Sequence, residues 1–176
     1  IGVYVTASDA ALQLAGNEVN NELFTYNGTS WTSKRKVYWN TGKHNVYAFY
    51  PYSKKVNDVV DYSFSVQTDQ STDWGYSHSD FLFASASEVE SSADPIAMQF
   101  SHKLSNVVVN LEKGENFEGV IPASAEVYLL STVPQAVIDL STGDAAKDSY
   151  CAEAAIRCHQ VSNTQYQAIV VPQSLT

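Results

Sequence analysis

The run Ser77, His78, Ser79 and Asp80 places the most reactive side chains of the sequence next to one another. Serine, histidine and aspartate are the three members of a hydrolytic triad, which requires them to converge in space. Neighbours in an extended chain point to opposite faces, and neighbours in a loop rarely converge. We therefore predict that this run forms no catalytic site.

Metal and cofactor chemistry has equally little support. His44, His78, His102 and His159 stand apart, without the short-range spacing of His, Cys and Asp that a metal site needs. The sequence has no phosphate-cradling glycine loop, no Gly-x-Ser-x-Gly and no His-Glu-x-x-His. His102 falls on the apolar side of a predicted strand, which favours a core histidine that donates to a backbone carbonyl. We predict no metal, no cofactor and no enzymatic activity.

Cys151 and Cys158 are separated by seven positions. An odd spacing puts two side chains on opposite faces of a straight strand, so a disulfide between them needs an intervening turn. In an exported protein the two could close a small loop, while free or buried thiols fit the spacing equally well. The spacing leaves both states open.

The strand pattern around which the chain is organised runs from residue 96 to residue 111. Apolar side chains occupy alternate positions, which is the period of a half-buried strand. They fall on even positions at first and on odd positions from residue 107, so the chain must bulge or bend near residues 105 and 106 to keep them facing one core. We expect buried core positions at Val46, Ala48, Val107, Val109 and Leu111.

Length and composition favour an all-β domain. The 176 residues include 11 tyrosines but 1 methionine, and tyrosine, valine and threonine prefer strands. Nine to eleven short predicted strands, separated by turns such as Asn27-Gly28, are typical of a β-sandwich of two packed, mainly antiparallel sheets with little helix. We expect residues 1–176 to form one such domain.

Net charge and hydropathy limit the classes of partner that the chain can bind. The formal net charge of -9 repels phosphate backbones, so we predict no nucleic-acid partner. No run of about 18 apolar residues could span a bilayer. The sequence opens and closes in strand-like segments, and we expect a leader, an anchor or a second domain to lie outside it.

Several stretches together resemble the N-terminal domain of the fimbrillin-like family. In chain order they are Trp31, Val-Tyr-Trp at 37–39, Tyr-Ala-Phe-Tyr-Pro-Tyr at 47–52, Asp-Phe-Leu-Phe-Ala at 80–84, Phe-Ser-His-Lys-Leu at 100–104, Val-Val-Val at 107–109 and Ala-Ile-Val-Val-Pro-Gln at 168–173. Each stretch alone is weak evidence for the family. Their order along nearly the whole chain makes the similarity specific.

The resemblance implies a longer, two-domain protein with transthyretin-like sandwiches, exported as a lipoprotein to the outer membrane of a Gram-negative anaerobe. It implies a structural subunit or adhesin of surface fimbriae or pili, whose partners are other fimbrial subunits or copies of itself joined by strand exchange. The alternative is a surface lipoprotein domain that binds host or bacterial glycans, or surface proteins, through exposed aromatic residues. Its candidates are Trp31, Trp39 and Trp74.

Ile1, Val3 and Val5 mark the predicted assembly edge. Residues 1–7 are apolar and β-branched, without the Lys, Arg or Pro that protects natural edge strands from pairing with other chains. Such a strand is either tucked between neighbours or exchanged with another chain. We expect the edge of the sheet near this strand to receive a strand from another subunit, through main-chain hydrogen bonds and alternating side-chain pockets.

Overall fold

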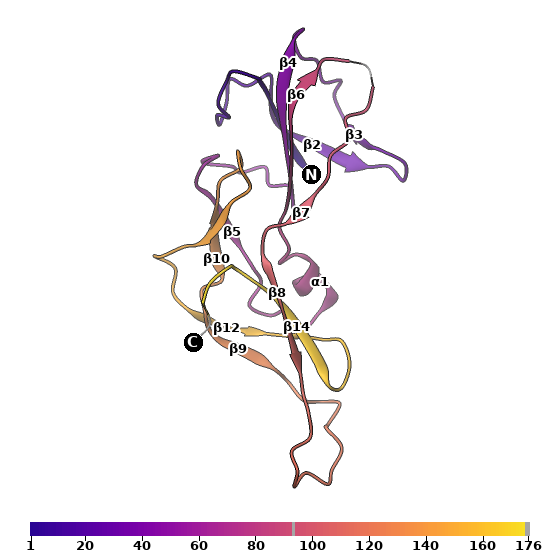
Figure 1. The fold of residues 1–176 in the computed structure, drawn as a ribbon, viewed down its shortest axis with the longest axis vertical. Helices are drawn as coiled ribbons and strands as arrows, with labels where there is room; N and C mark the ends of the chain where they lie inside the picture. The colour runs from indigo at the N-terminus through magenta and orange to yellow at the C-terminus, as the bar shows by residue number, and fades with distance from the viewer. Residues whose placement is uncertain (93, 175–176) are drawn as a thin grey trace. The chain divides into compact units, whose positions relative to one another are not determined.

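The computed structural model describes residues 1–92 and 94–174. These residues form fourteen strands and one helix of five residues, α1 (Asp73–Ser77) (Figure 1). The prediction of an all-β chain with little helix is confirmed, and the fourteen strands exceed the nine to eleven that were expected. Among the described residues no helix is long and apolar enough to cross a membrane.

The chain divides into two compact units. Unit 1 comprises residues 1–62, 81–103 and 138–144, and unit 2 comprises residues 63–80, 104–137 and those from 145 onward. Each unit is assembled from separate stretches of sequence. The expectation that residues 1–176 form a single domain stays a prediction.

Unit 1 is built on a six-stranded sheet with the order β3-β2-β1-β4-β6-β7. The strands are β1 (Gly2–Ala7), β2 (Val19–Tyr26), β3 (Trp31–Ser33), β4 (Lys43–Tyr50), β6 (Leu82–Glu90) and β7 (Ser101–His102). β1 is an interior strand, because it pairs antiparallel with β2 on one side and with β4 on the other. One face of this centre packs into the cluster Val3, Val5, Val19, Val46 and Ala48.

The opposite face of the unit 1 sheet is aromatic. Tyr4 stacks on Phe49, and Phe49 in turn contacts Tyr62 and Phe81 with ring centroids about 6 Å apart. Tyr4 is fully buried, although its hydroxyl has no hydrogen-bond partner among the described residues. Burial on both faces explains why β1 is mostly apolar and carries no charged residue.

The predicted hairpin at Asn27-Gly28 joins β2 to β3. Tyr26 pairs with Trp31, so the turn has four residues and not two. The Asn27 Oδ1 accepts hydrogen bonds from the backbone N–H groups of Thr29 and Ser30, and Gly28 supplies a φ of 101°. The asparagine side chain therefore closes the turn itself, which removes the need for a tight two-residue turn.

Unit 2 contains several short strands. β8 (Ser105–Asn110) pairs with β14 (Gln165–Val170), which also pairs with β13 (His159–Gln160). β9 (Tyr128–Thr132) pairs with β12 (Ala154–Arg157). A further sheet has the order β11-β10-β5 and comprises β5 (Tyr62–Ser65), β10 (Gln135–Ile138) and β11 (Ala145–Lys147).

Two glutamine amides complete the backbone pairing of unit 2. The Gln70 side chain accepts from the Ile169 N–H at 2.8 Å and donates to the Ile169 carbonyl at 2.7 Å. The Gln173 amide makes the same two bonds with the backbone of Val133, at 2.9 and 3.0 Å. Each amide thus takes the place of one residue of a neighbouring strand. Gln173 belongs to the Pro-Gln pair on which the family resemblance partly rests.

The predicted core is right in unit 1 and wrong in unit 2. Val46 and Ala48 are buried as expected, whereas Val107, Val109 and Leu111 are only half-buried. The alternation of these three residues is correct, but β8 is the last strand of its sheet and has a neighbour on one side alone. An edge strand buries less of each side chain, which accounts for the difference.

The predicted break in the central stretch occurs slightly earlier than expected. β7 ends at His102 and β8 begins at Ser105, and between them the chain passes from unit 1 to unit 2. The change from even to odd positions therefore marks a change of core. His102 is exposed, so the expectation of a core histidine is wrong. The reason is that β7 is a two-residue strand at the end of its sheet.

Candidate assembly surface

One edge of β8 carries no strand ladder among the described residues. Its other edge pairs with β14 over all six residues, from Ser105 opposite Val170 to Asn110 opposite Gln165. β8 reads Ser-Asn-Val-Val-Val-Asn and contains no Lys, Arg or Pro. An edge strand without charge, proline or bulge is open to pairing with another chain.

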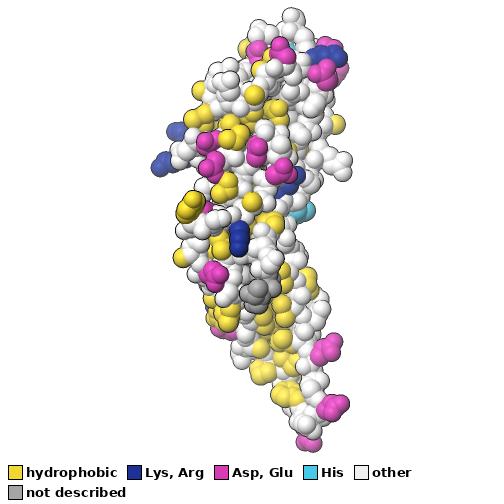
Figure 2. All heavy atoms as spheres, turned by 60° about the vertical axis from the view of Figure 1, so that its left-hand side comes forward, with side chains coloured by type: hydrophobic (Ala, Val, Ile, Leu, Met, Phe, Trp, Pro, Cys, Tyr) yellow, Lys and Arg dark blue, Asp and Glu magenta, His cyan; other side chains and the backbone are white. Residues whose placement is uncertain are grey.

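Unit 2 also exposes apolar side chains, one of them on β8 itself. They come from β8, from the loop that follows it and from β9, and we name them together the β8–β9 surface: Val108, Phe117, Val120, Tyr128 and Leu130. Val120 is 79% exposed and Leu130 is 68% exposed. Figure 2 shows hydrophobic side chains gathered in a band over the lower part of the view. Exposed apolar patches mark interaction sites.

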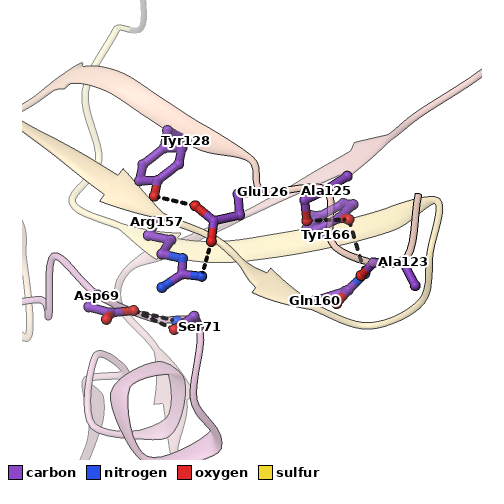
Figure 3. A network of polar contacts seen from close by, with 9 residues as sticks. All are labelled: Asp69, Ser71, Ala123, Ala125, Glu126, Tyr128, Arg157, Gln160 and Tyr166. Carbon is purple, nitrogen blue, oxygen red and sulfur yellow. Dashed lines mark hydrogen bonds and ion pairs between the residues drawn. The ribbon is translucent and has the colours of Figure 1, made fainter. Parts of the chain in front are cut away.

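A polar network holds the segment before β9 in place (Figure 3). The Tyr166 hydroxyl donates to the Ala125 carbonyl at 2.9 Å, and the Gln160 amide donates to the Ala123 carbonyl at 3.1 Å and to the Tyr166 hydroxyl at 3.0 Å. These bonds connect residues 123–125 to β13 and β14. The entry into β9 is therefore fixed by side chains from another sheet.

A carboxylate, Glu126, connects the network to β12. Glu126 pairs with Arg157 and accepts a hydrogen bond from the Tyr128 hydroxyl at 2.7 Å. That hydrogen bond raises the pKa of Tyr128 above its ordinary value, because ionisation would place two negative charges together. Hydrogen bonds from Ser71 lower the pKa of Asp69, and nearby Arg157 adds to this effect. Tyr128 is thus held as a neutral, oriented ring on the β8–β9 surface.

Ile1 precedes β1, and Val3 and Val5, the other residues of the predicted assembly edge, lie on this strand. β1 is paired on both sides, and Val3 and Val5 are buried in the core of unit 1. The absence of edge protection in residues 1–7 reflects an interior strand, the other outcome that such a sequence allows. A role for Ile1, Val3 and Val5 in assembly would require β1 to leave its sheet. That role stays a prediction.

Residues 77–80 do not have the geometry of a catalytic triad. The Ser77 Oγ lies 3.4 Å from the His78 Nδ1, but that nitrogen is also 3.0 Å from the Trp74 carbonyl. A ring N–H that donates to a carbonyl is not available as a base toward Ser77. Ser79 is buried, donates to the Gly75 carbonyl at 2.7 Å and accepts from the Gln67 N–H. Its hydroxyl is structural.

The other histidines, the cysteines and the tryptophans considered in the sequence analysis do not form a common site among the described residues. His44 is buried and stacks on Trp39, and His159 stacks on Tyr76. Among the described residues no three His, Cys, Asp or Glu side chains could hold a metal ion. Both cysteines are free, and burial raises the pKa of the Cys158 thiol. Trp31 and Trp74 are exposed, whereas Trp39 is half-buried.

The β8–β9 surface itself was not predicted. A signal existed in the three consecutive valines at 107–109, since any straight strand must turn one of them outward. The apolar run Val127, Tyr128, Leu129 and Leu130 has the same property. Alternate residues of each run form the face that the period of a strand predicts to be buried, and the apolar residues between them form the exposed face.

Comparison with known proteins agrees with this fold. A family model described as fimbrillin-like matches residues 1–176. The chain belongs to the fimbrillin-like family. The family resemblance found in the sequence is therefore confirmed.

Relatives of this fimbrillin-like chain come from Bacteroides species. It is 29% identical over 126 aligned positions to the "Putative fimbrium tip subunit Fim1C" of Bacteroides ovatus, covering 63% of this chain and 23% of that protein. The chain thus spans less than a quarter of the length of this curated relative.

Solved structures show the same fold. A "putative cell adhesion protein" from Bacteroides uniformis superposes with a TM-score of 0.74 at 22% identity, over 97% of this chain and 67% of that one. A second, from Bacteroides ovatus, gives a TM-score of 0.72 at 20% identity, over 99% and 68% of the two chains. Family and relatives together support a fimbrial or adhesion role.

Proposed function

We propose that this fimbrillin-like chain is a subunit or adhesin of a surface fimbrium and that it joins its neighbours by strand addition at β8. The observation that carries the proposal is the open edge of β8 among the described residues, on a strand that exposes Val108. In a fibre, a strand from a neighbouring subunit pairs with β8 and covers this valine.

Strand addition matches the physical needs of this surface. Unpaired backbone N–H and C=O groups along β8 obtain partners from the added strand, which supplies affinity. Alternate side chains of that strand contact exposed apolar residues of β8 such as Val108, and this contact fixes the register. Burial of apolar area contributes about 25 cal/mol per Å² to association.

The proposal extends to the protein to which the chain belongs. We place the chain in a two-domain protein of transthyretin-like β-sandwiches, exported as a lipoprotein to the outer membrane. The donor strand then comes from another copy or another fimbrial subunit. Support for this extension is the family membership of residues 1–176.

Thermal unfolding with candidate strand peptides tests the proposal. A peptide copied from the C-terminal strand of the full-length protein, added at about 100 times its Kd, is expected to stabilise the chain by about 2.7 kcal/mol through mass action. Val108→Lys places a charge on the receiving edge and is expected to abolish the increase in Tm.

Val161→Lys is the matched control, because Val161 and Val108 are both valines of unit 2 and both 49% exposed. It should leave the peptide effect intact. A Tm that no candidate strand peptide raises, or an increase that survives in Val108→Lys, would show that β8 is not the receiving edge.

A further inference from the structure

We propose that Trp74 and His78 form a binding site for a neutral pyranose ring of a glycan. The site lies on α1 in unit 2, uses none of the residues of the β8–β9 surface and goes beyond fibre assembly. Trp74 is 60% exposed although it is the largest side chain of the helix. An indole held rigidly in water is a typical contact residue of recognition surfaces.

Helical spacing arranges the side chains of this site. Trp74 and His78 are four positions apart, so they share one face of the turn, and their rings stack with centroids 4.4 Å apart at 23°. Asp73 and Ser77 are also four apart and form the adjacent row. A flat aromatic surface therefore lies beside a carboxylate and a hydroxyl, and both Asp73 and Ser77 are exposed.

Backbone packing and hydrogen bonds hold the helical turn that carries Trp74 in place. A side chain at Gly75 would place its Cβ 2.2 Å from the Asp69 carbonyl oxygen, so the helix backbone packs directly on residue 69. Thr72 caps the helix through a hydrogen bond from the Gly75 N–H to its hydroxyl at 3.1 Å, and Ser79 binds the Gly75 carbonyl. Little conformational entropy remains to be lost when a ligand binds this face.

The polar groups of the site are also oriented. The His78 Nδ1 lies 3.0 Å from the Trp74 carbonyl, so a neutral His78 carries its proton on Nδ1 and leaves Nε2 unprotonated as an acceptor. The Asp73 carboxylate is fully exposed, with the His159 Nε2 3.7 Å from its Oδ1. Both groups accept hydrogen bonds, and sugar hydroxyls donate them.

A neutral sugar is the ligand class that this chemistry selects. One face of a pyranose presents C–H bonds, which contact the negative face of an indole ring favourably, while its edge presents hydroxyls. Asp73 at the site and the net charge of -9 disfavour sialylated, sulfated or phosphorylated glycans. Acidic glycans should accordingly bind more weakly than their neutral counterparts.

A glycan array probed with the full-length protein, followed by calorimetry with methyl-β-galactoside, methyl-β-glucoside and methyl-α-mannoside, tests the proposal. The wild type is expected to bind at least one neutral hexose class. Trp74→Ala should weaken that binding at least about tenfold, and Trp74→Phe should retain part of it. Tyr150→Ala is the control and should bind as the wild type does, because Tyr150 is an almost fully exposed aromatic residue of unit 2 outside the site.

Trp74→Ala is expected to keep the Tm of the wild type, since the removed ring is mostly exposed. If Trp74→Ala lowers the Tm, Trp74→Phe replaces it as the test variant. Wild-type protein that binds no neutral sugar, or Trp74 variants that bind as tightly as the wild type, would overturn the proposal. Fibre assembly is measured separately by the strand-peptide effect, so failure of one proposal leaves the other unaffected.

Discussion

At the scale of single residues, Tyr4 shows how a buried group sets the response of the fold to pH. It lies on the aromatic face of the unit 1 sheet, is fully buried and stacks on Phe49. Burial, with smaller contributions from Tyr62 and Tyr52, raises the pKa of Tyr4 to about 12. The folded state therefore keeps a proton that the unfolded chain releases near pH 10.

We predict an alkaline loss of stability that Tyr4→Phe reduces. The raised pKa contributes stability that is fully present below pH 10 and is lost as the pH rises to about 12, because only the unfolded tyrosine ionises in that window. The loss due to Tyr4 is on the order of 2 kcal/mol. At pH 7 the substitution should cost little, since the hydroxyl has no partner among the described residues.

Urea unfolding at intervals from pH 7 to pH 12 measures this effect. Tyr150→Phe, at an almost fully exposed position, controls for the loss of a hydroxyl. The interpretation of Tyr4 is wrong if wild type and Tyr4→Phe lose stability in parallel above pH 10.

At the scale of elements, sequence periodicity predicted the strands well and their neighbours poorly. The even-to-odd change near residue 105 correctly indicated a break, and Asn27-Gly28 correctly indicated a hairpin. Which strands lie at an edge was not predictable in this way. β1 and β8 both contain valines and no charged residue, yet β1 has two neighbours and β8 has one. The number of neighbours depends on pairing between distant segments.

Side-chain amides that replace strand residues were also beyond local patterns. Gln70 lies in a polar segment, but its amide is completely buried and pairs with Ile169, 99 positions along the chain. A polar residue that satisfies a distant backbone has no period of its own. Only the packed structure distinguishes Gln70 from the exposed glutamines.

Gln70→Leu is expected to destabilise the chain by about 2–4 kcal/mol, since it leaves the buried N–H and C=O groups of Ile169 without partners. Chemical denaturation monitored by circular dichroism measures the change. Gln99→Leu makes the same exchange at an exposed position and should have a small effect. A loss below about 1 kcal/mol in Gln70→Leu would mean that the Gln70 amide contributes little to the pairing.

At the scale of the whole molecule, the family could be predicted from the sequence and the division into units could not. Each unit draws on three stretches of the chain, and the crossing after Lys103 appears in the sequence only as a change of parity. For the candidate site too, the sequence predicted the general role but not the position. A role in assembly was implied by the resemblance; the sequence pointed to Ile1, Val3 and Val5, which stay a prediction, while the open edge of β8 that we propose became visible only in the structure.

Electron microscopy of fimbriae from cells that express the tagged full-length protein, labelled with gold-conjugated antibody, tests the central claim most directly. Wild type and Val161→Lys are expected to label the fibres. Val108→Lys is expected to reach the cell surface with an unchanged Tm and to be absent from fibres, because a charge on β8 prevents the neighbouring strand from pairing. Fibres that incorporate Val108→Lys as well as the wild type, or fibres that carry no wild-type label, would contradict assembly through β8.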